Sequence, residues 1–258
     1  MQKTDDCVTE INEDLERVSQ WAGGNGLGIN PMKSKALVIS RVCIDVSGVK
    51  KIKLNDSTIE FVNEARNLGV VFNRSLTWSN HINSLTGRVY GMLRTLCATQ
   101  KFTPFKIRML LAKSFLLPTL LYGCELYANC DSSDKSKLNK IFNNITRYVF
   151  CLRKFDHVSV FSVQIYSMSF DELLKFRVLL FLQKVVHGRE PMYLYNKLTF
   201  LTSSRFINLK MIRYKYLISE RQFLVSSVRL WNSLPNKLTF IKNPVHFRNE
   251  LKIYMSAM

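Results

Sequence analysis

The sequence is poor in acidic residues, in histidine and in the motifs of common enzyme sites. Its 258 residues include 19 Asp and Glu against 37 Lys and Arg, and its four histidines are scattered. The six cysteines form no Cys-x-x-Cys pair and have no histidine at metal-ligand spacing, which argues against a zinc site. No Gly-x-Ser-x-Gly elbow and no Gly-rich phosphate loop occurs. These absences argue against zinc-dependent, serine-hydrolase and P-loop chemistry.

Long apolar runs are also missing. The longest, over residues 114–124, is interrupted by Pro118 and is too short to span a bilayer. The first 18 residues contain no apolar core of the signal-peptide kind. We therefore expect an intracellular protein, nuclear or cytoplasmic, with reduced cysteines and no membrane partner.

The dominant feature that is present is positive charge. The formal net charge is +18, with a sequence pI of about 9.8, which makes nucleic acid the first partner to consider. The first 30 residues hold six of the 19 acids and two bases, so the remaining 35 bases face 13 acids. At 47% hydrophobic residues the chain can bury a core. A solvated basic surface without a partner remains an alternative.

The pattern predicts an α+β fold with a small N-terminal antiparallel β-sheet. Apolar residues at three- and four-residue steps from Val8 to Trp21 predict an amphipathic helix that ends before the glycines at 23 and 24. A strand is expected over 36–40, a hairpin over 49–62 around Asn55-Asp56, and a third strand over 67–72.

A mainly helical body follows. Helices are predicted over 82–96, 138–149 and 171–186, and from Pro244 to the end. A further helix is predicted to begin at Thr103-Pro104, with Thr103 as its N-cap, and to continue through Leu117. Residues 200–230 show no clear period and are expected to be extended or irregular.

Several short motifs occur in a specific order. They are Asp14 to Trp21, then Leu27-x-x-Asn30-x-x-Lys33-Ser34, Leu68-Gly69-Val70, Leu76-Thr77-Trp78 with His81-Ile82, and finally Trp231-Asn232-Ser233-Leu234-Pro235. In this order they resemble the end of the reverse transcriptase of jockey-like non-LTR retrotransposons. The resemblance implies a partial palm over 1–78, a helical thumb-like region over 79–152 and a basic C-terminal region over 153–258.

The resemblance also implies roles for single residues. Lys33 matches the lysine of the fourth palm motif, a candidate general acid for the departing pyrophosphate, and Leu68-Gly69-Val70 matches the primer grip. As a surface lysine after a turn, Lys33 would have nothing to protonate without a bound triphosphate, and the residues favour this second interpretation. The family binds Mg²⁺ through three aspartates that the resemblance places upstream of the helix beginning near Thr9. No cofactor is therefore expected in this chain.

The acidic pairs do not replace those aspartates. Asp5-Asp6 lies where a helix N-terminus favours acids, and the same holds for Asp171-Glu172 and for Asp131 with Asp134. We expect these pairs to cap helices, with a metal site as the alternative for Asp5-Asp6.

The basic body offers candidate contacts to an RNA or DNA duplex backbone. Cations interleave with Tyr90, Phe102 and Phe105, a mixture that binds phosphates and stacks on bases. The candidate nucleic-acid-binding residues are Arg88, Arg94, Lys101, Lys106, Arg108 and Lys113. Burial of the aromatics in the core is the alternative. From residue 191 onward, 11 bases face only Glu220 and Glu250, which makes this end a second candidate surface.

Three functions remain open from the sequence. The first is a truncated, non-catalytic nucleic-acid-binding remnant of a reverse transcriptase. The second is the C-terminal fragment of an active RNA-directed DNA polymerase whose start has been misplaced. The third is a basic helical interaction protein. A palm without its central strands would leave a sheet edge unpaired, so another chain covering that edge is a further candidate partner.

Overall fold

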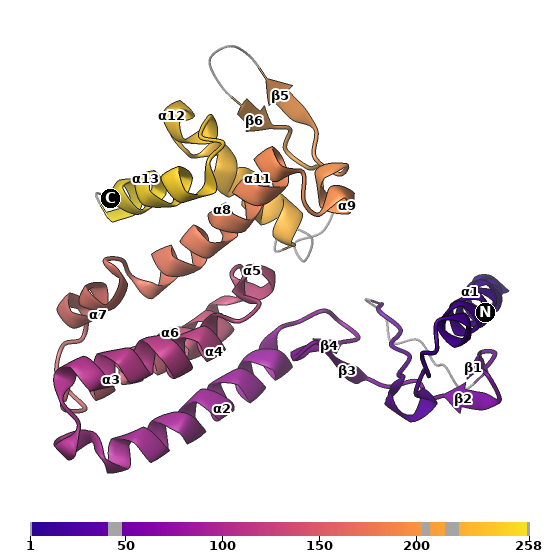
Figure 1. The fold of residues 1–258 in the computed structure, drawn as a ribbon, viewed down its shortest axis with the longest axis horizontal. Coiled ribbons are helices and arrows are strands. Elements are labelled where there is room, and N and C mark those ends of the chain that lie inside the picture. The colour runs from indigo at the N-terminus through magenta and orange to yellow at the C-terminus, as the bar shows by residue number, and fades with distance from the viewer. Residues whose placement is uncertain (1, 41–47, 203–206, 215–221, 257–258) are drawn as a thin grey trace. The chain divides into compact units, whose positions relative to one another are not determined.

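The computed structural model describes residues 2–40, 48–202, 207–214 and 222–256. The chain forms two compact units, residues 1–81 and residues 82–258. Both helices and antiparallel hairpins are present and the second unit is mainly helical, so the predicted α+β class is confirmed (Figure 1). Across the described residues, no helix combines the length and apolarity needed to cross a membrane.

The first unit is built on helix α1 (Gln2–Gly24) and the hairpin of β1 (Ile52–Leu54) and β2 (Ser57–Ile59). Val8 of α1 packs with Ile52, Leu54 and Ile59 in a small apolar core. The amide of Asn12 fixes the register between helix and hairpin, because its Nδ2 donates to the carbonyl of Lys51 and its Oδ1 accepts from the Lys53 amide. The amphipathic helix and the first hairpin are therefore confirmed, although α1 continues through the two glycines expected to end it.

The predicted strand over 36–40 is wrong. Ala36 makes one isolated parallel bridge to Phe61, and its N–H donates to the carbonyl of Glu60. Four residues later, the N–H of Ser40 donates to the carbonyl of Arg74, which follows the second hairpin. Because its backbone hydrogen bonds are divided between two neighbouring segments, this stretch forms no ladder with either.

The predicted strand over 67–72 contains a turn. Leu68 and Gly69 both have positive φ angles, 46° and 84°, and connect β3 (Glu64–Asn67) to β4 (Val70–Asn73). Two consecutive positive φ values are typical of tight hairpin turns, whose twist matches that of the paired strands. Leu68-Gly69 is therefore the tip of a hairpin. The pairs β1–β2 and β3–β4 are separate two-stranded sheets within the described residues.

The second unit begins within α2 (Ser79–Ala98), which is followed by a short 3₁₀ turn η2 (Gln100–Phe102). The following helix consists of α3 (Phe105–Leu111), a π-helical turn η3 (Ala112–Leu116) and α4 (Leu117–Leu121). Pro118 lies just after the π turn, and a proline cannot donate the hydrogen bond that would continue a regular α-helix. The helix predicted after Thr103-Pro104 is confirmed, but Thr103 does not cap it, since its hydroxyl donates to the carbonyl of Thr99.

Capping explains the two longest helices that follow. After α5 (Cys124–Tyr127), α6 (Ser132–Phe150) begins at Asp131, whose carboxylate accepts from the amide of Asp134 at 2.9 Å. After α7 (Ser159–Tyr166), α8 (Phe170–Gly188) begins with a reciprocal capping box between Ser169 and Glu172. The predicted capping roles of these acids are confirmed.

Helix α8 forms the centre of the second unit. Figure 1 shows it between α5 and α6 on one side and α11 (Phe223–Asn232) and α13 (Pro244–Ser256) on the other, and it contacts all four. Ten of its residues are buried, from Phe170 to Val186, so it is apolar on most faces. The remaining elements are α9 (Met192–Tyr195), the hairpin of β5 (Phe200–Thr202) and β6 (Ile207–Leu209), and α12 (Asn236–Thr239).

The Trp-Asn-Ser-Leu-Pro motif stabilises this C-terminal part. Trp231 is fully buried, its Nε1 donates to the carbonyl of Ile207 at 2.9 Å, and its ring stacks on Phe247. The Asn232 amide pairs with both backbone groups of Leu209, at 2.7 and 2.9 Å. Helix α11 was missed by the sequence expectation of an irregular segment over 200–230, because short apolar steps there resemble those of a strand.

Candidate nucleic-acid interface

Lys33 lies in the first unit, at the end of the 3₁₀ turn η1 (Pro31–Lys33). Pro31 favours the first position of the turn, and the Asn30 side chain accepts from the Lys33 amide at 3.3 Å. The Lys33 side chain is exposed, and the nearby ion pair in this segment is the one between Lys35 and Glu60 at 3.0 Å. The motif thus forms a capped turn, and the general-acid role of Lys33 stays a prediction.

The acidic pairs of the sequence occupy separate helix beginnings. Asp5 and Asp6 lie in the first turns of α1, whereas Asp131 and Asp171 belong to the beginnings of α6 and α8. In the part of the chain that is described, no three Asp, Glu, His or Cys side chains gather as a metal site would need. The described carboxylates of these pairs therefore lie at separate helix beginnings and do not form one cluster.

Arg108 differs from the other predicted cations. Its guanidinium donates to the carbonyls of Val149 at 2.8 Å, of Gln100 at 3.5 Å, and of Thr103. It is half-buried and ties α3 to the end of α6 and to the turn after α2. These contacts give Arg108 a structural role, and they direct its charge toward the protein.

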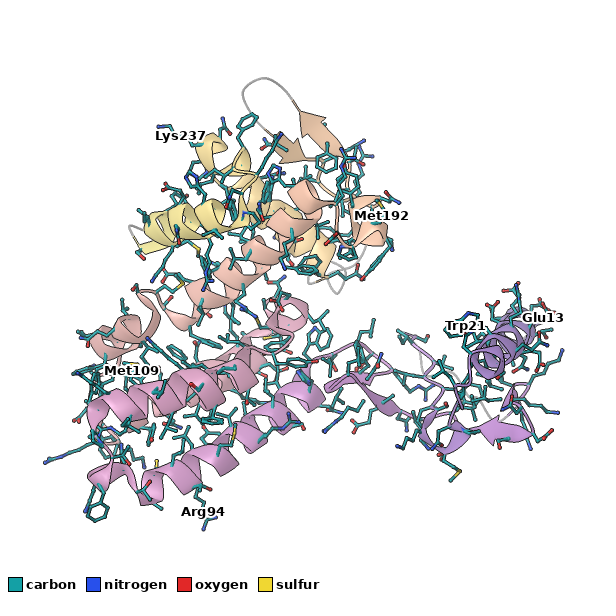
Figure 2. The ribbon with its side chains drawn as sticks, viewed as in Figure 1. Glu13, Trp21, Arg94, Met109, Met192 and Lys237 are labelled. Carbon is teal, nitrogen blue, oxygen red and sulfur yellow. The ribbon has the colours of Figure 1, made fainter. Side chains whose placement is uncertain are left out.

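The other predicted cations are exposed on the second unit. Arg88 and Arg94 lie on α2, Lys101 on η2, Lys106 on α3 and Lys113 on η3. Figure 2 shows Arg94 pointing away from the helical body. The structure brings Arg88 and Arg94 onto one helix, whereas Lys106 and Lys113 belong to the next one.

A hollow of about 330 Å³ lies between α2 and α6, next to η2. Arg94 lines it together with Arg147 of α6, and both charged groups at the hollow are therefore cationic. Polar side chains hold the walls together, since Asn144 donates to the hydroxyl of Tyr90 at 3.1 Å and accepts from Arg147 at 3.4 Å. Gln100 donates to the carbonyl of Tyr148 at 2.7 Å.

The thiol of Cys97 and the hydroxyl of Tyr148 belong to the same lining. Burial, followed by the neighbouring Cys151, raises the pKa of the Cys97 thiol above its usual value. Burial also raises the pKa of Tyr148, followed by the effect of Cys97. Because neither group ionises near neutral pH, the two guanidinium groups give the hollow its positive potential. Such a site suits a phosphate group.

The sequence analysis did not include Arg147. A signal for it exists, because Lys140, Asn144 and Arg147 follow one another at four- and three-residue steps and so share one face of α6. That α6 lies beside α2 depends on tertiary packing, and the spacing of residues within one helix does not predict which other helix it packs against.

A flat strip runs along the exposed face of α2. At about 100° per residue, Gly87, Gly91 and Ala98 share one face, with Arg94 on one flank and Arg88 on the other. A Cβ added to either glycine would meet no atom within 4 Å. The two glycines are therefore not required by packing inside the chain, although each lowers helix stability relative to alanine.

The aromatic rings near these cations are on the surface. Phe102 is 88% exposed, Phe105 is 46% exposed and Tyr90 is 44% exposed. Phe105 also packs against Phe150, with ring centroids 5.3 Å apart. The alternative that these aromatics form the core is wrong, and the ring of Phe102 is the most accessible of the three for stacking.

The C-terminal bases are also exposed where the structure describes them. Lys197, Lys210 and Arg213 line a hollow of about 400 Å³ beside the β5–β6 hairpin. Arg205, Lys215 and Arg221 lie outside the described residues. This surface remains a second candidate for backbone contacts.

Comparison with known proteins identifies relatives of one kind. The chain is 25% identical over 150 residues to the probable RNA-directed DNA polymerase from transposon X-element of Drosophila melanogaster. This aligned stretch covers 56% of this chain and 16% of that protein. It is 28% identical over 143 residues to the RNA-directed DNA polymerase from mobile element jockey of Drosophila funebris, covering 52% of this chain and 15% of that protein. No family model and no solved structure matches the chain significantly.

Proposed function

Because the chain resembles, over about half of its length, the reverse transcriptases of jockey-like non-LTR retrotransposons, we propose that it is a reverse-transcriptase-like protein whose helical unit binds the backbone of a nucleic-acid duplex. The matched stretches span about one sixth of the length of those relatives, so the polymerase activity in their names is not carried over with the resemblance.

The hollow between α2 and α6 is the main support for this proposal. It combines two guanidinium groups, Arg94 and Arg147, with amide and hydroxyl groups that can donate to phosphate oxygens. Arg88, on the other flank of the exposed face of α2, and Lys101, on η2, add two exposed cations to this part of the second unit. Four cations in one region are a small but sufficient set for salt-dependent backbone binding.

The glycine strip supports a close approach of the partner. Gly87 and Gly91 leave the α2 backbone uncovered between Arg88 and Arg94, so a phosphate backbone can approach this strip more closely than a surface that carries side chains. A protein that kept these glycines for folding alone would gain stability from alanine at both positions. We infer that the strip serves contact with the nucleic acid.

We propose further that this chain alone does not catalyse nucleotide addition. Nucleotidyl transfer uses metal ions held by clustered carboxylates, which stabilise both the attacking and the leaving oxygen. The described acidic pairs instead begin separate helices, where they accept backbone hydrogen bonds or complement the helix dipole. This proposal corresponds to a truncated remnant that has lost the catalytic aspartates.

A second candidate follows from the coverage of the relatives. Since the match spans 16% and 15% of their lengths, the chain would also fit as the C-terminal part of a longer active polymerase that supplies the carboxylates. Translation of the genomic DNA upstream of Met1 distinguishes the two. An in-frame Tyr-x-Asp-Asp hairpin supports the longer polymerase, and its absence supports the remnant.

Two measurements test the proposed function. In primer extension with magnesium, the isolated chain should incorporate no nucleotide, and any incorporation contradicts the claim that it is inactive alone. In fluorescence anisotropy with a labelled RNA–DNA duplex, Arg94→Ala should bind about 5- to 10-fold more weakly than the parent chain. Arg17→Ala removes an exposed arginine of α1, in the first unit and outside both candidate surfaces, and is the matched control. Equal losses for the two variants would contradict a localised interface.

A further inference from the structure

A second pocket, of about 400 Å³, lies between α5, α8, α9 and α11. Three aromatic residues from three different elements line it, Phe181, Tyr193 and Phe223, together with leucine side chains. Among the residues that the structure describes, one charged side chain lines it, Glu125 of α5. None of these residues belongs to the candidate nucleic-acid interface.

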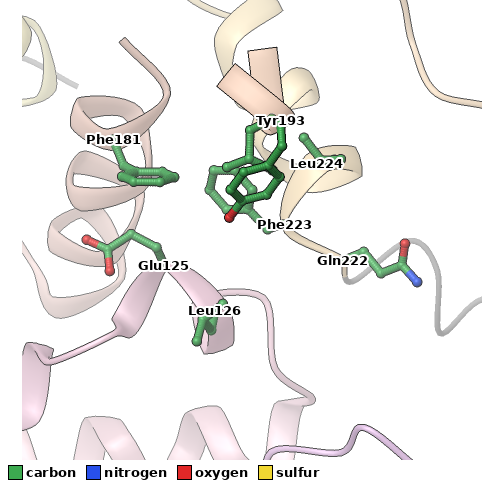
Figure 3. Close-up of a pocket in the computed structure, with 8 residues that line it drawn as sticks. Glu125, Leu126, Phe181, Tyr193, Gln222, Phe223 and Leu224 are labelled. Atoms are coloured by element: carbon green, nitrogen blue, oxygen red, sulfur yellow. The ribbon is translucent and has the colours of Figure 1, made fainter. Parts of the chain in front are cut away.

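The aromatic rings face different directions. Phe181 and Phe223 have centroids 5.4 Å apart and planes 71° apart, so the two rings stand nearly perpendicular to one another. Figure 3 shows Phe181 pointing across the pocket toward Tyr193 and Phe223, with Glu125 beside Phe181. Tyr193 is 66% exposed, so it forms an open wall at the solvent side. The pocket therefore has a corner made by the edge-to-face pair Phe181 and Phe223, and Tyr193 adds a third ring at its solvent side.

The electrostatics of the pocket differ from those of the chain. The chain carries a net charge of +18, whereas the charged residue of this lining is an acid. Aromatic faces also carry negative potential and attract cations. Nε of Arg177 lies 3.6 Å from Oε1 of Glu125, so the two side chains form an ion pair without a short hydrogen bond, and Glu125 is the member of the pair that lines the pocket.

The ligand must therefore be both cationic and apolar on its surface. A phosphate or carboxylate would meet the like charge of Glu125, and a bare ammonium would lose its hydration among the leucines and rings. A methylated ammonium carries positive charge behind methyl groups, so it satisfies the rings, the leucines and the carboxylate together. We propose that this pocket binds a methylated ammonium group, on a lysine side chain or on a free quaternary amine.

The test compares three neutral-flanked peptides that differ at one central side chain. The first carries trimethyllysine, the second unmodified lysine, and the third the uncharged tert-butyl analogue of trimethyllysine. Calorimetric titration of the full chain should show the trimethyllysine peptide binding at least about tenfold more tightly than the other two. Equal binding of the uncharged analogue overturns the proposal, because a purely apolar pocket would explain it. Equal binding of unmodified lysine overturns it as well, and so does undetectable binding of all three.

Choline, titrated alone, separates the two sources of the group. Choline binding as tightly as the peptide supports a free quaternary amine, and tighter peptide binding supports a methylated protein. Phe223→Leu keeps an apolar wall but removes a ring, so it should weaken trimethyllysine binding about tenfold. Phe102→Leu is its matched control, because it makes the same change at an exposed ring that does not line this pocket. Glu125→Gln should also weaken binding, whereas Glu250→Gln on α13 should not. Unchanged binding in both pocket variants overturns the proposal.

Discussion

Replacing Gly91 by alanine is expected to stabilise the helical unit and to weaken its binding to a nucleic-acid duplex. Gly91 lies in the middle of α2, and a Cβ at this position would meet no atom within 4 Å. Alanine therefore adds no clash and removes the conformational cost of glycine in a helix. The free energy of unfolding should rise by about 0.5–1 kcal/mol.

The expected change in melting temperature follows from the size of the unit. For 150 to 250 residues, about 1 kcal/mol shifts the melting temperature by roughly 2–4 °C, so this variant should melt about 1–4 °C higher. Thermal unfolding followed by far-ultraviolet circular dichroism measures this shift. A lower melting temperature would show that the added methyl group meets something in the folded chain.

Binding should change in the opposite direction. Gly91→Leu places a branched side chain on the strip between Arg88 and Arg94, and an enforced steric misfit typically costs about 1 kcal/mol or more, which is about fivefold in affinity. Gly91→Ala should lie between the parent chain and Gly91→Leu. Asn249→Leu, on the exposed face of α13, controls for the added apolar surface. Unchanged duplex affinity in both Gly91 variants would refute the inference that this strip contacts nucleic acid.

Three further outcomes follow from single contacts. Arg108→Ala leaves several backbone carbonyls without their donor and should lower the free energy of unfolding by about 1–3 kcal/mol, as measured by urea denaturation, whereas Arg94→Ala should change it little. Burial lowers the pKa of His187 below its usual 6.5, so the unfolded chain takes up this proton first; stability should fall as pH falls below about 6.5 toward the lowered value, and His187→Gln should reduce that slope. Burial raises the pKa of Cys124 to about 12, so this thiol should resist iodoacetamide in the native chain while the exposed Cys7 reacts, and equal labelling rates would contradict its burial.

Local signals in the sequence were sufficient for α6 and α8 of the second unit. The beginnings of α6 and α8 follow from Asp131 and from the Ser169–Glu172 box, because a cap acts within one turn and leaves a readable pattern. The first hairpin follows from Asn55-Asp56 for the same reason, and Asn55 has a φ of 51°.

Features that depend on distant partners could not be predicted in this way. The segment after Lys33 has the composition of a strand, but its hydrogen bonds divide between Glu60 and Arg74, which are set by the packing of two hairpins. Arg108 is indistinguishable in sequence from the neighbouring cations, and its role depends on the carbonyl of Val149, 41 residues away. The same limit applies to Arg147, whose partner helix is far from it in the chain.

The Trp-Asn-Ser-Leu-Pro motif is one of the motifs that resemble reverse transcriptases, and its role in this chain is structural. Trp231 and Asn232 are held by the backbone of the β5–β6 hairpin, so this motif stabilises the C-terminal part of the fold. Lys33 is exposed on a capped turn, with its matching motif intact. A motif of this kind indicates common descent, and its chemistry depends on residues elsewhere.

The salt dependence of duplex binding tests the central claim most directly. If Arg88, Arg94, Lys101 and Arg147 each neutralise one phosphate, the logarithm of the association constant should fall with the logarithm of salt concentration at a slope of about −3.6. The Arg94→Ala, Arg147→Ala double variant should show a slope of about −1.8, because two of the four contacts are lost. An unchanged slope in the double variant, or an affinity of the parent chain that does not depend on salt, would contradict the proposed interface.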